Sequence, residues 1–121
     1  MHWIPLLIVG AILVAVLMLI KSGQISVEEA RNHLKNGALV IDVRTPEEFR
    51  AGHLAQASNI PLDEITTAVP RQVKDRNQIL LLHCASGMRS GMAQKQLRSL
   101  GYLRVFNLGS FTRAQHLLPG N

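Results

Sequence analysis

The chain has 121 residues, of which 47% are hydrophobic and 17% are charged, and its formal net charge is +5. This length fits one domain rather than two. The single cysteine, Cys84, excludes an internal disulfide scaffold and a cysteine-rich zinc module. All 13 basic and 8 acidic side chains follow Ile20, and the apolar periodicity after that residue excludes a disordered chain.

The uncharged beginning of the chain predicts a membrane anchor. Residues 3–20 form an uninterrupted run without Asp, Glu, Lys or Arg. A helix over this run is about 27 Å long, close to the roughly 30 Å hydrocarbon core of a bilayer. We therefore expect an N-terminal transmembrane anchor over residues 1–21 and a separate domain over residues 22–121.

Positive charges predict how such an anchor is oriented. Lys21, Arg31 and Lys35 follow the apolar run, and no Lys or Arg precedes it. The positive-inside rule then places the N-terminus outside and the domain in the cytoplasm. The alternative is a cleaved signal peptide, which leaves the domain periplasmic or secreted. The run disfavours that alternative, because it lacks a basic beginning and Lys21-Ser22-Gly23 is a poor cleavage site.

Helices and strands alternate after residue 22. Two capping boxes mark helix starts: Ser26-x-x-Glu29 opens a helix that Gly37 ends, and Thr45-Pro46-Glu47-Glu48 opens a brief one. Short apolar segments between the helices are typical of buried strands. The expected strands cover residues 38–43, 57–60, 79–82 and 105–108, and the later helices cover a stretch from Leu62 that Pro70 interrupts, residues 90–100, and a segment from Phe111. This alternation predicts an α/β fold with right-handed crossovers and a mostly parallel sheet.

Chemistry concentrates at Cys84, where an apolar strand runs into a helix. The segment Cys84-Ala85-Ser86-Gly87-Met88-Arg89-Ser90 lies at that junction, and functional loops of α/β sheets follow the carboxyl ends of strands. The helix N-terminus supplies unpaired N–H groups, Gly87 lets the loop turn its amides inward, and Arg89 adds a cation. Together these features predict a thiol pKa lowered from about 8.5 into the range of roughly 3.5–7.5. They disfavour the alternative of a buried, inert cysteine.

Three segments of the domain form a recognisable pattern. They are residues 40–49 (VIDVRTPEEF), residues 52–61, where Gly-His-Leu precedes Ala-x-Asn-Ile-Pro, and the Cys-x-x-Gly-x-Arg-Ser sequence of residues 84–90. In this order they resemble the segments of single-domain rhodaneses, which are sulfurtransferases. The resemblance implies a three-layer α/β domain with a five-stranded, mostly parallel sheet. It also implies that Cys84 takes up a sulfane sulfur as a persulfide, held by the amides of residues 85–89.

The resemblance implies a sulfurtransferase of the thiosulfate sulfurtransferase type. The donor is thiosulfate or a persulfide, and the acceptor is a thiol or a protein cysteine. The expected catalytic residues are Cys84 and Arg89, and the expected substrate-binding residues are Ala85, Ser86, Gly87, Met88 and Ser90. We expect no cofactor, no metal site and no nucleic-acid partner, because the histidines lack ligand spacing and the basic residues lack interleaved aromatics. Ala85 and Met88 make the loop wall less basic than in loops richer in Lys or Arg, which leaves the affinity for anionic thiosulfate open.

Two other functions stay open at this point. A membrane-tethered, rhodanese-like module could recruit a partner with little turnover, because Gly109-Ser110-Phe111 replaces the Gly-Gly and later Trp that often close the family. A cysteine-dependent phosphatase or arsenate reductase is disfavoured, because the related phosphatases have a Cys-x5-Arg loop. Here four residues separate Cys84 from Arg89.

Other polar residues near these segments have structural interpretations. Asp42 and Arg44 are expected to form an architectural charge pair at a strand end, and His53 a hydrogen-bonded turn. Strand alternation is expected to point His83 to the face of the sheet opposite Cys84.

Overall fold

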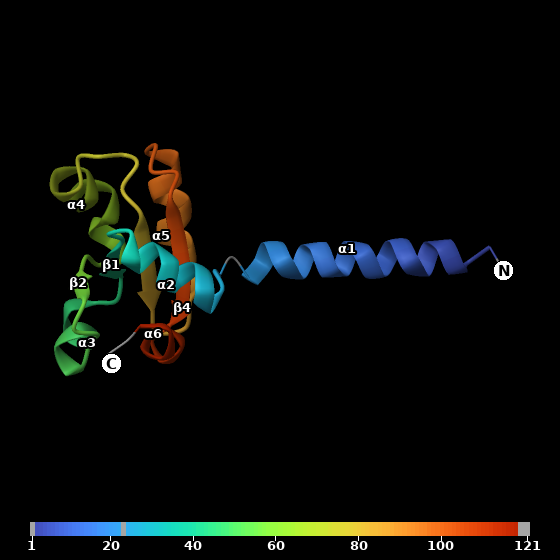
Figure 1. Cartoon of the computed structure of the whole chain (residues 1–121), viewed down its shortest axis with the longest axis horizontal. Helices are drawn as coiled ribbons and strands as arrows, with labels where there is room; N and C mark the ends of the chain where they lie inside the picture. Colours follow the sequence, from blue (N-terminus) through green and yellow to red (C-terminus); the bar gives the residue numbers. More distant parts are fainter. Residues whose placement is uncertain (1, 23, 119–121) are drawn as a thin grey trace.

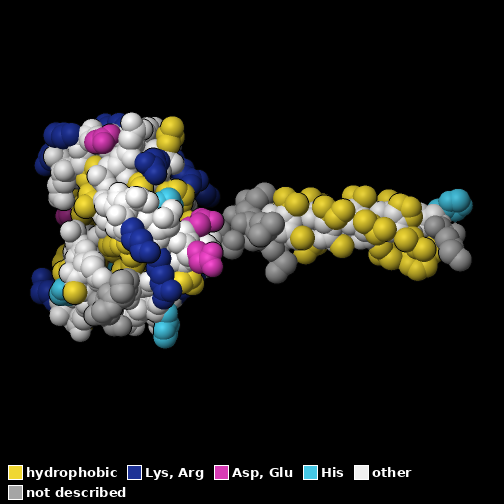
Figure 2. All heavy atoms as spheres, in the orientation of Figure 1, with side chains coloured by type: hydrophobic (Ala, Val, Ile, Leu, Met, Phe, Trp, Pro, Cys, Tyr) yellow, Lys and Arg dark blue, Asp and Glu magenta, His cyan; other side chains and the backbone are white. Residues whose placement is uncertain are grey.

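The computed structural model of the chain describes residues 2–22 and 24–118, so Met1, Gly23 and residues 119–121 lie outside it. Helix α1 (Ile4–Ser22) extends away from an α/β domain formed by the later elements (Figure 1). Figure 2 shows hydrophobic side chains along the visible face of α1, whereas charged side chains of both signs are scattered over the domain.

The structure does not support the membrane anchor expected over residues 1–21. Within the described residues, no helix combines the length and the apolar character needed to cross a membrane. Trp3 lies in a turn before α1, and Lys21 and Ser22 are the last two residues of that helix. The orientation and localisation derived from the charges depended on that anchor and stay predictions.

The domain is built on a sheet of four parallel strands in the order β2-β1-β3-β4. The strands are β1 (Leu39–Asp42), β2 (Ala57–Asn59), β3 (Leu80–Cys84) and β4 (Val105–Ser110). The parallel α/β fold is confirmed, but the expected fifth strand is wrong. The segment before the second helix forms only an isolated bridge from Gln24 to Asn107. Just Gln24 and Ile25 run beside β4 before that helix begins, which is too short for a strand.

Helices cover both faces of the sheet, which agrees with the three-layer domain that the family resemblance implied. The helical elements after α1 are α2 (Val27–Lys35), α3 (Pro46–Ala51), the 3₁₀ turn η1 (Leu62–Glu64), α4 (Ile65–Gln72), α5 (Met88–Ser99) and α6 (Phe111–Leu117). Buried residues of α4 and α5 share one core cluster, and buried residues of α2 and α6 share the other. Successive strand residues alternate between these clusters: Leu80 and Leu82 face the first and Leu81 faces the second.

The capping signals read from the sequence are present at both helix starts, as half of the predicted box at Ser26 and as a complete box at Thr45. The Ser26 hydroxyl accepts a hydrogen bond from the amide of Glu29 at 3.2 Å. Thr45 and Glu48 form a complete capping box at the start of α3.

The interruption expected at Pro70 is wrong, because α4 continues through that residue to Gln72. Pro70 removes one backbone donor, but the helix ends only two residues later. Ile65 at the start of α4 and Val69 in its last turn are both fully buried in the core, so packing stabilises the helix at both ends.

The carboxyl ends of the strands meet at one edge of the sheet and position the residues of interest. Asp42 pairs with His83, and Cys84 pairs with Ser110. A register shift between Leu82 and His83 makes β4 irregular at this edge, as bulges often do beside functional sites. A separate surface cleft of about 320 Å³ is lined by residues of α2, β1, β2 and α4 and their flanking loops, and none of residues 84–90 lines it.

Candidate active site

Cys84 is the last residue of β3, and hydrogen-bond donors surround its sulfur. The residue is fully buried, whereas Ala85 and Ser86 immediately after it are exposed. The Gly87 amide donates to Sγ at 2.9 Å, and the amide and the hydroxyl of Ser90 each lie 3.4 Å from Sγ. Burial alone raises the pKa of the thiol, but the hydrogen bonds from Ser90, Gly87 and Ser86 outweigh it and lower the pKa. Because these donors favour the thiolate, the geometry suits a nucleophilic sulfur.

Two glycines allow the loop to close around the sulfur. Gly87 caps α5 with a φ of +98°, and Gly109 of β4 has a φ of +95°. Both angles lie in the left-handed region that glycine adopts without strain. A Cβ on Gly87 would lie 3.4 Å from the Cα of Gly109. The loop therefore sits close to β4, with its amides turned toward Sγ.

Asn107 of β4 holds the loop through side-chain hydrogen bonds, and the sequence analysis did not identify it. Its Nδ2 donates to the Gly87 carbonyl at 3.1 Å, and its Oδ1 accepts from the Ser90 hydroxyl at 2.7 Å and from the Gly109 amide at 2.8 Å. The Asn107 side chain is buried with its polar atoms paired to the loop. An asparagine within an otherwise apolar strand segment was the only signal available in the sequence, and it carries no information on its partner.

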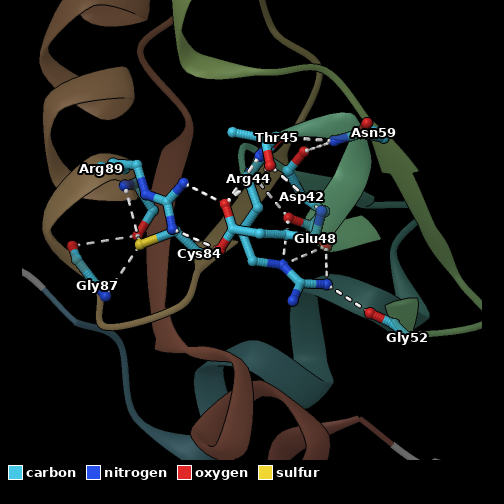
Figure 3. A network of polar contacts seen from close by, with 10 residues as sticks. Asp42, Arg44, Thr45, Glu48, Gly52, Asn59, Cys84, Gly87 and Arg89 are labelled. Atoms are coloured by element: carbon cyan, nitrogen blue, oxygen red, sulfur yellow. Dashed lines mark hydrogen bonds and ion pairs between the residues drawn. The ribbon is translucent and has the colours of Figure 1, made fainter. Parts of the chain in front are cut away.

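Arg89 lies in the first turn of α5 and pairs with a carboxylate from another helix. Its Nη1 and Nη2 lie 2.6 and 2.9 Å from Oε1 and Oε2 of Glu48 on α3, which forms a two-pronged ion pair (Figure 3). The hydrogen bond with Arg89 is the main cause that lowers the pKa of Glu48 from 4.5 to about 2. The same pairing raises the pKa of Arg89. Both side chains are therefore ionised at neutral pH. Sequence reasoning had assigned Glu48 only to the capping box of α3.

Asp42 and Arg44 form the architectural pair that the sequence predicted. Arg44 donates from Nε and Nη2 to the buried Asp42 carboxylate at 2.8–3.0 Å and from Nη2 to the Gly52 carbonyl at 2.7 Å. Asn59 donates to the carbonyls of Asp42 and Arg44. These bonds fix the turn that leads into α3, and α3 carries Glu48.

The histidines also match their structural interpretations. His83 is fully buried, its Nε2 lies 3.7 Å from Asp42 Oδ2, and its ring stacks on Phe111. Burial is the main cause that lowers its pKa, so the ring is neutral at neutral pH. His53 contacts the Phe49 carbonyl through Nδ1 at 2.8 Å. Within the described residues, no group of three His, Cys, Asp or Glu side chains is arranged to hold a metal ion.

The structure brings most of the predicted site residues together. Cys84, Gly87 and Ser90 meet at the sulfur, and Ser86 contributes through its backbone. Met88 is 76% exposed at the start of α5, where it forms part of the surface beside the loop. Arg89 is directed toward Glu48 (Figure 3). The arrangement can hold an anionic sulfur with neutral donors.

Comparison with known proteins places this geometry among relatives. A sequence model described as the Rhodanese-like domain matches residues 26–115. The thiosulfate sulfurtransferase PspE of Escherichia coli is 39% identical over 69 residues, which cover 57% of this chain and 66% of that protein. A sulfurtransferase of Allochromatium vinosum is 37% identical over 83 residues, 67% of this chain and 76% of that protein. The chain thus spans just under two thirds of the length of PspE.

A solved structure gives the same picture of the fold. The human single-domain sulfurtransferase TSTD1 superposes with a TM-score of 0.66 at 30% identity. The match covers 77% of this chain and 95% of that one.

Proposed function

We propose that this chain, which belongs to the rhodanese-like domain family, transfers a sulfane sulfur through a persulfide on Cys84. One observation carries the proposal: three donors from the Gly87 and Ser90 positions converge on a sulfur at the N-terminus of α5. Such donors stabilise negative charge on the sulfur both before and after it is loaded. The sulfurtransferase relatives support the same reaction class.

The first step is attack by the Cys84 thiolate on the outer sulfur of the donor. With thiosulfate, a bond forms between Sγ and the outer sulfur, the S–S bond of thiosulfate breaks, and sulfite leaves with the electron pair. The product is a Cys84 persulfide anion. The amides of Gly87 and Ser90 donate hydrogen bonds toward this sulfur, and they stabilise the charge without needing to reorganise.

The Ser90 hydroxyl is suited to follow the charge during this step. It has one proton to donate, and its oxygen lies within reach of Sγ, Asn107 Oδ1 and the Gly87 carbonyl. As negative charge builds up on the sulfur, a hydrogen bond from the Ser90 hydroxyl to Sγ becomes more favourable than one to Asn107. Asn107 Oδ1 still accepts from the Gly109 amide when that happens.

The second step returns Cys84 to its thiolate. An external thiolate, either a small molecule or a protein cysteine, attacks the outer sulfur of the persulfide and breaks the bond to Sγ. The acceptor must be external, because Cys84 is the single cysteine of the chain. Cyanide is a suitable assay acceptor and leaves as thiocyanate.

Intact mass of the full chain tests the proposal directly. The protein is measured before and after thiosulfate or a hydropersulfide, and again after cyanide, with Cys84→Ser beside it. We expect a gain of one sulfur atom that cyanide reverses and that the variant lacks. Retention of the gain in Cys84→Ser, or no gain with either donor, would overturn the proposal.

A further inference from the structure

Apart from the Cys84 thiolate, Arg89 is the one charged residue within residues 84–90, so its state decides whether the loop offers a positive charge to a donor. Its guanidinium makes two bonds of 2.6 and 2.9 Å to both oxygens of Glu48. About one third of each side chain is exposed, so the pair lies at the protein surface beside the loop. With both terminal nitrogens bonded to Glu48 and its charge balanced by that carboxylate, the guanidinium attracts an incoming anion less than an unpaired Arg would.

Glu48 is itself held in place from its own helix. Its Oε1 accepts from the Thr45 amide at 3.1 Å and from the Thr45 hydroxyl at 3.2 Å. The Glu48 amide in turn donates to the Thr45 hydroxyl at 3.2 Å. This capping box fixes the carboxylate at the start of α3, where it faces α5 (Figure 3). The capping box therefore holds the Glu48 carboxylate beside Arg89 in one rotamer, which a substrate would not easily displace.

When Glu48 balances the charge of Arg89, the groups left to bind the donor are neutral. Ala85, Ser86 and Met88 bring no charge to the loop, and the contacts to Sγ come from amides and one hydroxyl. Such donors suit a single sulfur atom. They offer no full positive charge to thiosulfate, whose oxygen atoms hold negative charge at a distance from the reacting outer sulfur.

From this arrangement we infer that Glu48 sets the donor preference of the site: by neutralising Arg89 it disfavours the thiosulfate dianion and favours a hydropersulfide. The inference rests on the proposed function and names its donor class. The Cys84 thiolate attacks the outer sulfur of a hydropersulfide R–S–SH. A bond forms between Sγ and that sulfur, and the S–S bond of the hydropersulfide breaks. Cys84 then carries –S–SH, and the thiolate RS⁻ leaves with the electron pair. No dianion has to approach the Glu48–Arg89 pair in this reaction.

Four proteins that differ in charge at the pair test the inference. Glu48→Gln adds one positive charge to the site, Arg89→Gln removes one, and the double variant restores the original total. Gln keeps the capping box, because its side-chain oxygen also accepts from Thr45. Glu47→Gln is the matched control. It makes the same change of charge on the same helix, at an exposed residue that pairs with Arg50 and not with the loop.

The readout is the donor ratio, kcat/KM with thiosulfate divided by kcat/KM with cysteine hydropersulfide. Because one unit charge acts on a dianion across a partly exposed site, we expect this ratio to rise about tenfold in Glu48→Gln. The change should appear in KM for thiosulfate rather than in kcat. The ratio should fall in Arg89→Gln, return near the original value in the double variant, and stay unchanged in Glu47→Gln.

Each other outcome has a definite meaning. Equal losses with both donors in Glu48→Gln would make Glu48 a purely structural residue and overturn the inference. A double variant as poor with thiosulfate as Arg89→Gln would show that Arg89 binds the donor directly, which also overturns it. If the original chain loads no sulfur from either donor, the proposed function itself fails. Loading without the expected order of ratios removes only the role of Glu48.

Discussion

Ser90 provides the most direct test of how the Cys84 thiol is activated. Its hydroxyl and its amide each lie 3.4 Å from Sγ, and replacement by alanine removes only the hydroxyl. A hydrogen bond to a charged group contributes about 1.5–3 kcal/mol. The contact is long, and Asn107 competes for the same proton at 2.7 Å. We therefore take the lower end of that range, about 1.5 kcal/mol, for the loss in Ser90→Ala.

This loss raises the pKa of the Cys84 thiol, because the removed donor stabilises the thiolate and not the thiol. About 1.5 kcal/mol corresponds to roughly tenfold less thiolate at any pH below both pKa values, and to no difference above them. Thiolate absorbance is followed against pH, with Cys84→Ser as the baseline that removes the contribution of the tyrosine. Absorbance is preferable to an alkylation rate, because a thiolate of higher pKa is also a stronger nucleophile.

Ser86→Ala is the matched control for this experiment. Ser86 lies in the same loop, but it acts on the sulfur through its backbone amide, which the substitution retains. Its titration curve should overlay that of the unmodified chain. Overlaying curves for Ser90→Ala as well would refute the reasoning, because the Ser90 hydroxyl would then contribute nothing to the thiolate. A thermal melt of each variant separates loss of folding from loss of the donor.

Three further predictions concern stability. Asp42→Asn breaks a buried ion pair with Arg44 and should lower the free energy of unfolding by about 3–5 kcal/mol in urea; a loss under 1 kcal/mol would contradict the architectural role. Gly109→Ala places a Cβ at a φ of +95° and should cost about 1–2 kcal/mol, whereas an unchanged urea midpoint would show that β4 relaxes there. The hydrogen bond with Arg89 lowers the pKa of Glu48 from 4.5 to about 2, so the stability it contributes is complete above pH 4.5 and is lost as the pH falls through 2. Unfolding measured across that window should be less acid-sensitive in Glu48→Gln, and equal sensitivity would argue against the pair.

Local signals in the sequence predicted the elements well, because their causes are local. Thr45 and Glu48 are three residues apart and cap the same helix, and the apolar run before Cys84 forms a buried strand that ends at a helix start. The position of Cys84 at the carboxyl edge of a parallel sheet follows from that order of elements. These features need no knowledge of which distant segments meet.

The parts that the sequence did not reveal all depend on distant segments. Ser90 and Asn107 are 17 residues apart, and Glu48 and Arg89 are 41 residues apart. The packing of α5 against β4 brings the first pair into contact, and the approach of α3 to the start of α5 brings the second. The number of strands was missed for a similar reason, since Gln24 reaches β4 but its segment is too short to form a ladder.

The site also predicts how the thiol responds to salt, because neutral donors and a free cation respond differently. The donors from Gly87 and Ser90 contact the buried sulfur at 2.9–3.4 Å. Dissolved ions cannot enter these contacts, although the Debye length falls from about 10 Å at 0.1 M to about 3 Å at 1 M. Thiolate titration at the two salt concentrations should therefore give the same curve. If a free Arg89 cation at the rim lowered the thiol pKa instead, salt would screen it and the pKa would rise. A clear rise between 0.1 and 1 M that Arg89→Gln does not show would mean that Glu48 does not hold Arg89 neutralised in solution.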